Sequence, residues 1–412
     1  MPIIAFPKET VAGEKRCALL PSNIKAYVLL GASVQIETGL GAHLYINDEQ
    51  YIEAGATVVK DRKKLLGKAD VVLSVHKLPE QDLALLTNKV VISFLDPFNG
   101  GDYVKQLCEK QVTSLSMEMI PRSTRCQKMD ALSSQASLAG YVMVAKAMNQ
   151  LHSIFPMMMT AAGTIKPCKV FVIGAGVAGL QAIATAKRLG AAVTAFDTRS
   201  VVAEQVQSLG AKFLEIDLGD TGQTAQGYAQ ALTPEQMAIQ QAAQEKCIAE
   251  SDIVITTAQL FGRKPPVLIT KQTIGVMKPG SVIVDMAAEN GGNVEGSVAG
   301  DTTVVNGVTI VGTGNWASEV ALNASQMYAN NLFNLVSEFW NKDDNVFVVD
   351  LNDEIQQSAV ITHAGSISNA TIKEIHRSED PEQDLAQEKA QHPAEQKVSS
   401  SNVEAEKTLE TA

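Results

Sequence analysis

Along the first half of the chain, the spacing of apolar positions changes repeatedly between two periods. Short apolar runs, typical of buried strands, are followed by segments in which apolar residues recur every three or four positions, the period of an amphipathic helix. The runs predict strands at 3–8, 33–37, 69–75, 90–96 and 112–117, with helices at 22–30 and 48–54. Because a chain that alternates strands with crossover helices builds a parallel sheet, we predict a parallel sheet flanked by helices.

A second unit of the same kind follows a long helical pattern that extends from 133 to about 152. Beyond this helix, strands are predicted at 169–173, 193–197, 213–217, 253–257, 282–286 and 309–311. An amphipathic helix from 321 to about 340 then leads back to the first unit, and 346–350 and 359–362 are predicted to follow as a short strand pair. We therefore predict a first domain made of 1–132 plus 318–372, and a second domain at 133–317.

Composition and charge exclude several classes of protein. At 412 residues, with 45% hydrophobic and 19% charged residues, the chain is long enough for two domains with ordinary cores. It has no run of about 18 apolar residues, so no segment is expected to span a bilayer. The net charge of −11 argues against nucleic acid and anionic membrane surfaces as primary partners. The N-terminus lacks the basic and apolar regions of a signal peptide and is interpreted as a first strand of a cytoplasmic protein.

The positions of the cysteines do not indicate a metal site. The five cysteines are scattered, with no C-x-x-C pair and no histidine at metal-ligand spacing. We interpret them as thiols in a reducing cytosol and predict no metal. Cys126 is of interest because it lies beside the candidate loop described below.

Two segments have few apolar residues. The last 40 residues, 373–412, carry ten acidic and five basic side chains and are predicted to be a disordered acidic tail. The glycine-rich segment 218–232 is interpreted either as a lid or as a disordered loop. Directly after it, Thr233-Pro-Glu-Gln236 predicts a helix start with a capping box.

The second unit opens on a glycine motif, G-x-G-x-x-G, between a predicted strand and a predicted helix. Gly174 permits the turn, Gly176 lets the backbone approach a pyrophosphate, and Gly179 lets helix and strand pack closely. Asp197, 23 positions after Gly174, ends the next strand, where it can accept hydrogen bonds from a ribose and would repel a 2′-phosphate. Glycine turns also serve packing alone, but strand, helix, second strand and acid occur here in the order that dinucleotide binding requires. We predict binding of NAD rather than NADP, through Gly174, Gly176, Val177, Ala178, Gly179, Asp197, Thr198, Arg199, Thr257, Ala258 and Gln259.

A polar stretch between the two units, 121–135, contains Arg122, Gln127, Asp130 and Ser133. Gln127 and Asp130 are three residues apart, so one helical turn would let Asp130 orient the Gln127 amide. In a second interpretation the stretch is a capped connector, in which Asp130 caps a helix and the arginines are solvated. The spacing alone does not decide between these two interpretations.

Several stretches closely resemble the alpha subunit of the proton-translocating NAD(P) transhydrogenases. They are 122–135, 155–164, 179–190, 256–258, 277–285 and 288–293, within a resemblance that covers about 1–370. The resemblance implies two Rossmann-like, doubly wound parallel-sheet domains joined by long helices, with NAD in the cleft between them. It also implies a homodimer, and a fold shared with alanine dehydrogenase.

The resemblance implies roles for the polar stretch. Gln127 would position the dihydronicotinamide, Arg122 and Ser133 would contact its carboxamide, and Asp130 would orient the loop. The segment 218–232 would be a mobile loop that places Tyr228 over the adenosine, which favours the lid. NADP(H) would bind a different subunit, hydride would cross between the two nicotinamides, and a membrane component would couple this step to proton passage. The chain would then be a bacterial cytoplasmic protein held at the inner membrane by the NADP(H)-binding and transmembrane subunits, which would be separate polypeptides.

Two other functions are weighed against this one. An alanine-dehydrogenase-like enzyme needs proton donors and a cation for the substrate carboxylate, yet His76-Lys77 and Asp96-Pro97 stand where a lysine and a histidine are expected. Arg16 matches the shared N-terminal motif, although a structural ion pair explains it equally well, and His76 is interpreted as a satisfied structural residue. A non-catalytic NAD sensor that signals through its tail is the third hypothesis. Departures from the transhydrogenase pattern occur at 259–266, at 313–318 and at Leu232.

Overall fold

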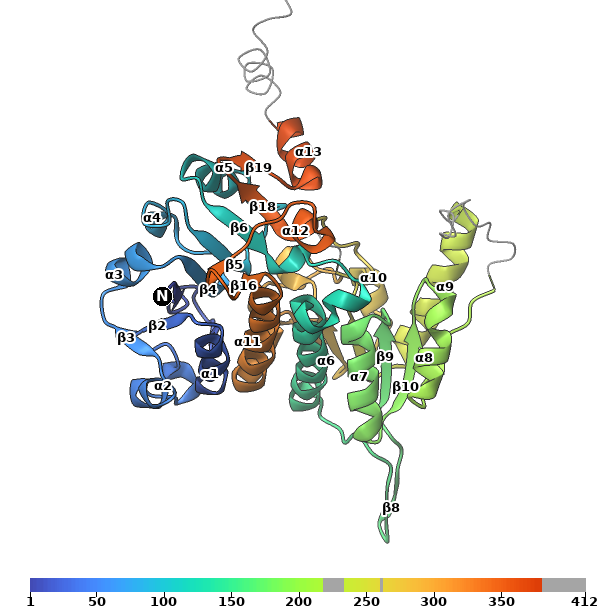
Figure 1. The fold of residues 1–412 in the computed structure, drawn as a ribbon. Coiled ribbons are helices and arrows are strands. Elements are labelled where there is room, and N and C mark those ends of the chain that lie inside the picture. Colours follow the sequence, from blue (N-terminus) through green and yellow to red (C-terminus); the bar gives the residue numbers. More distant parts are fainter. Residues whose placement is uncertain (218–232, 260–261, 380–412) are drawn as a thin grey trace, which may run out of the picture.

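The computed structural model describes residues 1–217, 233–259 and 262–379. Two twisted sheets, each dominated by parallel strands, lie on either side of two long helices, α6 (Ala131–Gln150) and α11 (Ala321–Glu338) (Figure 1). The prediction of an α/β fold with two Rossmann-like parallel sheets is confirmed. The domain boundaries given above remain a prediction.

The first sheet is parallel across six strands, in the order β3-β2-β1-β4-β5-β6. These are β1 (Ile3–Phe6), β2 (Ser33–Glu37), β3 (Thr57–Val59), β4 (Val71–His76), β5 (Val90–Phe94) and β6 (Thr113–Ser116). The chain returns late to add β18 (Val360–His363) and β19 (Ser366–Ile367) as an antiparallel edge. Strand order reverses between β1 and β4, which is the switch point of a doubly wound sheet.

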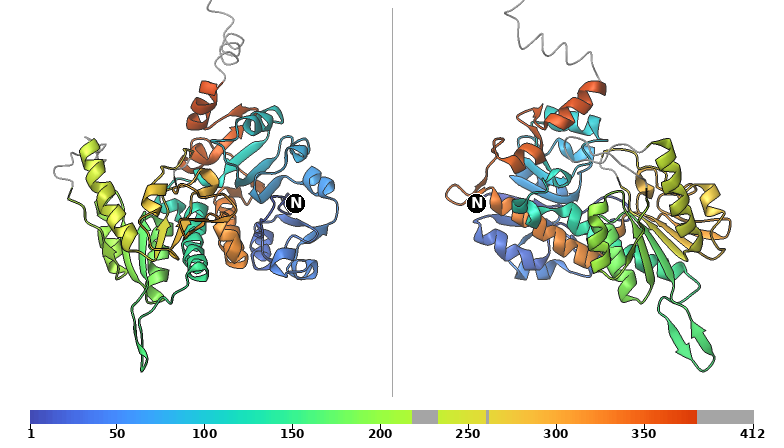
Figure 2. Two further views of the ribbon diagram at one scale, coloured as in Figure 1. Left: turned by 180° about the vertical axis from the view of Figure 1, so that it is seen from behind. Right: turned by 90° about the vertical axis from the view of Figure 1, so that its right-hand side faces the viewer.

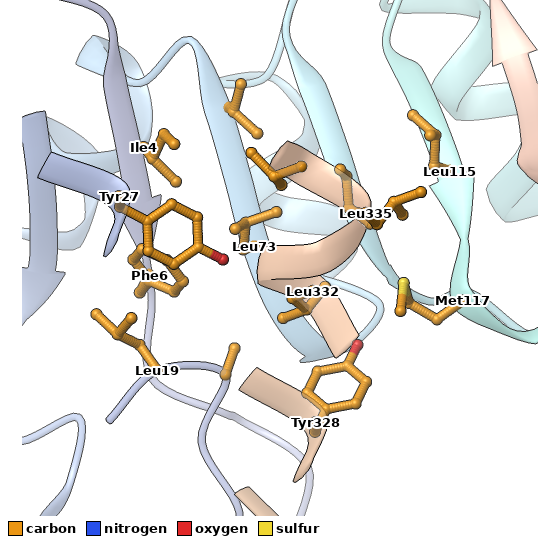
Figure 3. Packing of buried hydrophobic residues seen from close by; sticks show 14 of the residues in the cluster. Ile4, Phe6, Leu19, Tyr27, Leu73, Leu115, Met117, Tyr328, Leu332 and Leu335 are labelled. Atoms are coloured by element: carbon orange, nitrogen blue, oxygen red, sulfur yellow. The ribbon is translucent and has the colours of Figure 1, made fainter. Parts of the chain in front are cut away.

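Helices cover both faces of this sheet. They are α1 (Pro21–Leu29), α2 (Asp48–Glu53), α3 (Arg62–Lys68), α4 (Glu80–Leu83), α5 (Gly101–Glu109), α12 (Glu354–Ala359) and α13 (Ala370–Glu379). On one face, Phe6 and Leu73 pack against Tyr27 of α1 and Leu332 of α11 (Figure 3). The rings of Phe6 and Tyr27 meet edge to face, with centroids 5.5 Å apart. Burial of each such side chain contributes about 1.5–3 kcal/mol to stability. The buried apolar face of α11 therefore holds this helix against the first sheet.

The second sheet has the order β11-β10-β9-β12-β13-β15-β14. Its strands are β9 (Lys169–Ile173), β10 (Ala192–Phe196), β11 (Lys212–Phe213), β12 (Ile253–Thr256), β13 (Val282–Asp285), β14 (Thr302–Val305) and β15 (Val308–Val311). Only β14 is antiparallel to its neighbour, and the switch point lies between β9 and β12. The helices are α7 (Val177–Arg188), α8 (Ala203–Ser208), α9 (Pro234–Glu250) and α10 (Lys271–Ile274). The predicted capping box at Thr233 and Gln236 is confirmed at the start of α9.

A glycine lets α6 and α7 touch. A Cβ atom added at Gly140 of α6 would lie 2.2 Å from the carbonyl oxygen of Ala178 in α7. Close packing of the two backbones therefore joins the helix after the polar stretch to the helix after the glycine motif. α6 also packs against α11 and against the 3₁₀ helix η6 (Trp316–Val320).

Three predictions about local structure are wrong. The strand expected at 213–217 is confined to Lys212–Phe213. The segments 346–350 and 359–362 do not pair: β17 (Val346–Phe347) pairs with β16 (Trp340–Asn341), and β18 pairs with β6 and β19. The pattern indicates that a strand exists, whereas its partner depends on the assembled sheet.

The third correction concerns the tail. Disorder was expected from residue 373, but α13 continues through 373–379. The helix is anchored by Ile372, which is fully buried, and by His376, whose Nε2 lies 3.0 Å from the carbonyl oxygen of Pro97. The burial of Ile372 and the hydrogen bond of His376 thus hold a helix in a segment whose composition is hydrophilic. The remaining expectations for 380–412 and for 218–232, including Tyr228 and Leu232, fall outside the described residues.

A projecting hairpin is absent from the predictions. β7 (Met158–Thr160) and β8 (Gly163–Ile165) pair as an antiparallel arm that extends away from both sheets (Figure 2). Every residue from 156 to 165 is exposed. Among the helices that the structure describes, none is long and apolar enough to cross a membrane.

Candidate dinucleotide site

A cavity of about 750 Å³ lies between the two units, with lining residues from both. Its volume is in the range of sites that enclose a small molecule or a cofactor. Of the residues predicted to bind NAD, the lining includes Gly174, Gly176, Val177, Ala178, Asp197, Thr198, Arg199, Thr257, Ala258 and Gln259. The structure therefore brings together, along one surface, residues from three strand ends. Their role in binding remains a prediction.

The glycine motif forms the turn between β9 and α7. Gly174 has φ +101°, in the region that favours glycine. A Cβ atom at Gly179 would lie 1.9 Å from the Gly174 carbonyl oxygen, whereas a Cβ at Gly176 would meet no atom within 4 Å. Gly179 is therefore required by packing, and Gly176 leaves open space at the N-terminus of α7. Such a helix N-terminus, with its N–H groups and positive dipole end, suits a phosphate.

Asp197 stabilises the glycine turn by a hydrogen bond to its backbone. Its carboxylate accepts hydrogen bonds from the backbone N–H of Ala175, at 2.8 Å, and of Arg199, at 2.9 Å. The Arg199 guanidinium pairs with the same carboxylate at 3.0 Å. Burial opposes ionisation, but these hydrogen bonds outweigh it and hold the pKa of Asp197 below its ordinary value. The carboxylate is thus a charged acceptor at the end of β10, already balanced by a neighbouring cation.

Thr257, which was predicted to bind NAD, and two buried residues to which no role was assigned support the strand ends beside the glycine turn. Thr257 donates from Oγ1 to the Gly174 carbonyl, at 3.1 Å. Asn293 is fully buried and donates from Nδ2 to the carbonyls of Ala258, at 3.0 Å, and Pro266, at 2.9 Å. Buried Asp285 in turn accepts from the Asn293 N–H at 3.0 Å. Residues 288–293 match the resemblance, which was the only signal that could have indicated this support.

The polar stretch is only partly brought to the cavity. Arg122 and Ser133 line it, whereas Gln127 is exposed and, with Asp130, lies outside the lining. Both carboxylate oxygens of Asp130 accept from Ser133, from its N–H at 2.8 Å and from its hydroxyl at 2.6 Å. Asp130 is therefore the N-cap of α6, as the connector interpretation expected. It meets Gln127 through a backbone bond, from the Asp130 N–H to the Gln127 carbonyl at 3.4 Å.

Arg16, which lines the cavity, belongs to a buried ion pair. Its guanidinium donates to Glu14 at 2.6 and 2.9 Å and to Gln135 Oε1 at 2.9 Å. His76 Nε2 lies 2.6 Å from Glu14 as well, so this histidine has a structural partner. Burial opposes ionisation of Glu14, but hydrogen bonds from Arg16 and His76 outweigh it and place its pKa well below the ordinary range. Glu14 was missed, because no pattern marked a lone glutamate in a loop.

Two glutamates cover strand ends of the first sheet, Glu9 at its switch point between β1 and β4 and Glu118 beside the ends of β5 and β6. Glu9 accepts from the N–H groups of Val75, at 2.7 Å, and His76, at 3.1 Å. Glu118 accepts from the N–H groups of Leu95, at 3.1 Å, and Asp96, at 2.8 Å. Desolvation by burial raises the pKa of both glutamates. A phosphate at this switch point would meet the acidic side chain of Glu9, so the second sheet is the one suited to a dinucleotide.

All five cysteines lie in the described residues of the chain and are free thiols. Cys126 is fully buried in the core of the first unit, and its sulfur lies 3.2 Å from the Ser123 hydroxyl. It therefore serves packing beneath the polar stretch.

Known proteins share this two-unit arrangement. The family model "Alanine dehydrogenase/PNT, N-terminal domain" matches residues 5–139, and "Alanine dehydrogenase/PNT, C-terminal domain" matches 143–370. The chain belongs to the alanine dehydrogenase/PNT family. The two matched regions meet within α6.

Within this family, the chain is similar to transhydrogenase subunits. It is 43% identical to an NAD(P) transhydrogenase alpha subunit polypeptide of Rhodospirillum rubrum over 90% of this chain and 98% of that protein. A crystal structure of transhydrogenase from Sinorhizobium meliloti is 41% identical and covers 89% of this chain and 99% of that one, with a TM-score of 0.80. The resemblance to the transhydrogenase alpha subunit is confirmed. An L-alanine dehydrogenase structure, 23% identical over 91% of this chain and 99% of that one, with a TM-score of 0.77, shares the fold.

Proposed function

We propose that this chain is the peripheral NAD(H)-binding subunit of a proton-translocating NAD(P) transhydrogenase. Hydride would pass between NADH bound by this chain and NADP⁺ bound by a partner subunit, and a transmembrane subunit would couple the reaction to proton movement. The observation that carries the proposal is the cavity that joins the glycine turn to Arg122 and Ser133, in a chain 43% identical to a transhydrogenase alpha subunit.

The residues present fit NAD. Open space at Gly176 and the N-terminus of α7 suit the pyrophosphate, and Asp197 suits the adenosine ribose. Arg122 and Ser133 line the same cavity and would contact the carboxamide, and Gln127 would position the ring. The bound dihydronicotinamide would supply the hydride. The protein would orient the ring, hold it near the second nicotinamide and limit access of water.

Neither Arg16, which lines the same cavity, nor His76 is an unpaired cation or proton donor. Amination of a 2-oxo acid needs a cation for the substrate carboxylate and a group that donates a proton. Arg16 is already paired with Glu14, and His76 is bonded to the same carboxylate. Hydride exchange between two nicotinamides needs neither group, so this arrangement favours the transhydrogenase over the amino-acid dehydrogenase.

A reconstituted complex tests the proposal. The purified chain, mixed with an NADP(H)-binding partner and membrane subunits of a transhydrogenase, should transfer hydride from NADH to an NADP⁺ analogue, with little activity when any component is missing. Gln127→Asn shortens the side chain by one methylene and should slow transfer by about tenfold or more, because oriented hydride transfer is sensitive to small displacements. The NADH dissociation constant, measured by fluorescence, should stay within about twofold, since the phosphates and ribose are held elsewhere.

Gln272→Asn, at an exposed position on α10, is the matched control and should leave both quantities unchanged. Loss of NADH binding in Gln127→Asn would show that Gln127 is structural. NADH oxidation with pyruvate and ammonia by the chain alone would contradict the transhydrogenase proposal.

We also propose that the chain forms a homodimer through the β7–β8 arm. Met157 and Met159 are 60% and 73% exposed, and Ile165 is 46% exposed. An isolated two-stranded hairpin is marginally stable in water, so these apolar residues need a partner surface. A second copy offers one, because a cavity of about 640 Å³ lies at the base of the arm, lined by Met148 and Phe155 among others.

Replacing 158–165 by two glycines should convert the dimer to a monomer in sedimentation experiments. The two ends are already adjacent, since Met158 pairs with Ile165, and the unfolding midpoint of the remaining chain should change little. Met159→Lys, which keeps the arm and adds a charge, should weaken the dimer by an intermediate amount. A dimer of unchanged stability after removal of the arm would contradict this role.

A further inference from the structure

The segment that carries Gln127 is a short helix that depends on its surroundings. Residues Thr124–Met129 form a 3₁₀ helix, η3. Hydrogen bonds in such helices have poorer geometry than in α-helices, and runs of more than about four residues are uncommon. Cys126 and Met129, on its inner side, are fully buried in the core of the first unit. Packing therefore holds one side of η3, and the other side needs support of its own.

Arg125 supplies this support on the outer side. Its guanidinium donates to Glu338, the last residue of α11, at 3.0 Å, and to Asp353, the N-cap of α12, at 2.7 Å. The same group lies 5.9 Å from the centroid of the Phe339 ring. One side chain thus joins η3 to the end of one helix and to the start of another.

Lys128 completes the attachment on the other side of Gln127. Its ammonium lies 3.0 Å from Glu338, and its carbonyl accepts from the side-chain amide of Asn331 at 3.0 Å. Hydrogen bonds from Lys128 and Arg125 lower the pKa of Glu338, so this shared carboxylate is ionised at neutral pH. Among the described residues, the Gln127 side chain has no hydrogen-bond partner, and its amide is free for a ligand.

We propose that Arg125 is a positioning residue for hydride transfer, because its pairing with Glu338 and Asp353 holds η3 where Gln127 can present its amide to the nicotinamide. This inference rests on the proposed function. The Arg125, Glu338 and Asp353 side chains are 42%, 22% and 17% exposed, so we expect these pairs to change global stability little and to act locally on the position of η3. A reaction between two oriented rings, in contrast, is sensitive to displacements of about 1 Å.

Arg125→Met, which keeps most of the aliphatic stem, is the test variant in the reconstituted complex. We expect single-turnover hydride transfer to slow by about tenfold, while the NADH dissociation constant changes less than about twofold. Arg125→Lys should restore some of the rate, because an ammonium can pair with one carboxylate but lacks the guanidinium fork. Lys169→Met, which breaks the exposed pair with Glu250 on the second sheet, is the control and should not slow transfer.

A double-mutant cycle separates positioning from general weakening. If Arg125 acts through Gln127, the loss caused by Arg125→Met should nearly vanish in the Gln127→Asn background. Transfer by Arg125→Met at the wild-type rate, or an undiminished loss in the double variant, would overturn the proposal.

Amide hydrogen exchange, measured without nucleotide, tests the attachment of η3 independently of hydride transfer. The backbone amides of 124–129 should exchange faster in Arg125→Met than in the wild type. In Lys169→Met their exchange rates should equal those of the wild type. If the wild-type complex transfers no hydride, the proposed function fails, and exchange alone then decides: faster exchange supports attachment of η3 by Arg125, and unchanged exchange overturns it.

Discussion

Gly179→Ala should abolish NADH binding in the micromolar range, with an affinity loss on the order of a hundredfold or more. The added Cβ would lie 1.9 Å from the Gly174 carbonyl oxygen and 2.9 Å from the Gly174 carbonyl carbon. Both are backbone atoms of the glycine turn, so neither can rotate away as a side chain would. Relief requires α7 to move away from β9, which displaces the N–H groups proposed to hold the pyrophosphate. Titration of NADH fluorescence measures the loss.

Two other glycines provide matched controls. A Cβ at Gly176 meets no atom within 4 Å, so Gly176→Ala should leave stability intact while it reduces the space for the pyrophosphate and weakens binding. A Cβ at Gly67 in α3 also meets open space, and Gly67→Ala should leave NADH affinity unchanged. Wild-type affinity in Gly179→Ala would show that the turn tolerates a displacement of α7, and would remove the glycine motif from the proposed site.

Glu14→Gln should lower the free energy of unfolding of the first unit by about 3–5 kcal/mol, the usual cost of leaving a buried charge unpaired. Arg16 is 7% exposed and would lose its anionic partner, while Gln135 and Asn315 can accept only weak, neutral hydrogen bonds from it. The glutamine keeps the size of the side chain, so the effect reports charge rather than a cavity. The midpoint of urea unfolding, followed by circular dichroism, measures it.

The pH dependence of this effect follows from the lowered pKa of Glu14. A carboxyl group with a lowered folded-state pKa stabilises the fold above its ordinary value of 4.5, and this stabilisation is lost as the pH falls below that value. The difference between Glu14→Gln and the wild type should therefore be full at pH 7 and shrink below about pH 4.5. Glu250→Gln, which breaks an exposed pair with Lys169, should change stability by less than about 0.5 kcal/mol. An equally small change in Glu14→Gln would contradict a charged pair.

Local patterns predicted most of the elements but few of their partners. The strands at 33–37 and 169–173 and the capping box of α9 follow from side chains within a few positions of one another. The pairing of β18 with β6 joins residues about 250 positions apart, and no local pattern carries that information. The start of α13 was missed for the same reason, since its anchor, Pro97, is distant in sequence.

The candidate site divides in a similar way. The places of Gly174 and Gly179 in the turn and of Asp197 at the end of β10 could be predicted from a strand, a turn and a helix in succession, whereas their roles in NAD binding remain a prediction. Asp130 illustrates the limit: the spacing to Gln127 allowed two interpretations, and the bonds to Ser133 select the N-cap. Asn293 and Arg125 act through residues from other segments of the chain. Glu14 pairs with nearby Arg16, but His76 and Ser318, which also contact it, come from distant segments.

For this protein, the sequence by itself determined two α/β units, a dinucleotide-type glycine turn and the chemical nature of the polar stretch. Each of these is set by the spacing of apolar residues, by the backbone freedom of glycine or by helix capping, which all act between residues a few positions apart. Only the tertiary structure decided that the Glu14–Arg16 pair is buried against His76 and Gln135, that Glu9 and Glu118 cover strand ends of the first sheet, and that Arg125 links the helix of Gln127 to Glu338 and Asp353. Those outcomes depend on which charged groups share a buried or crowded space, and this is settled only when distant segments pack together.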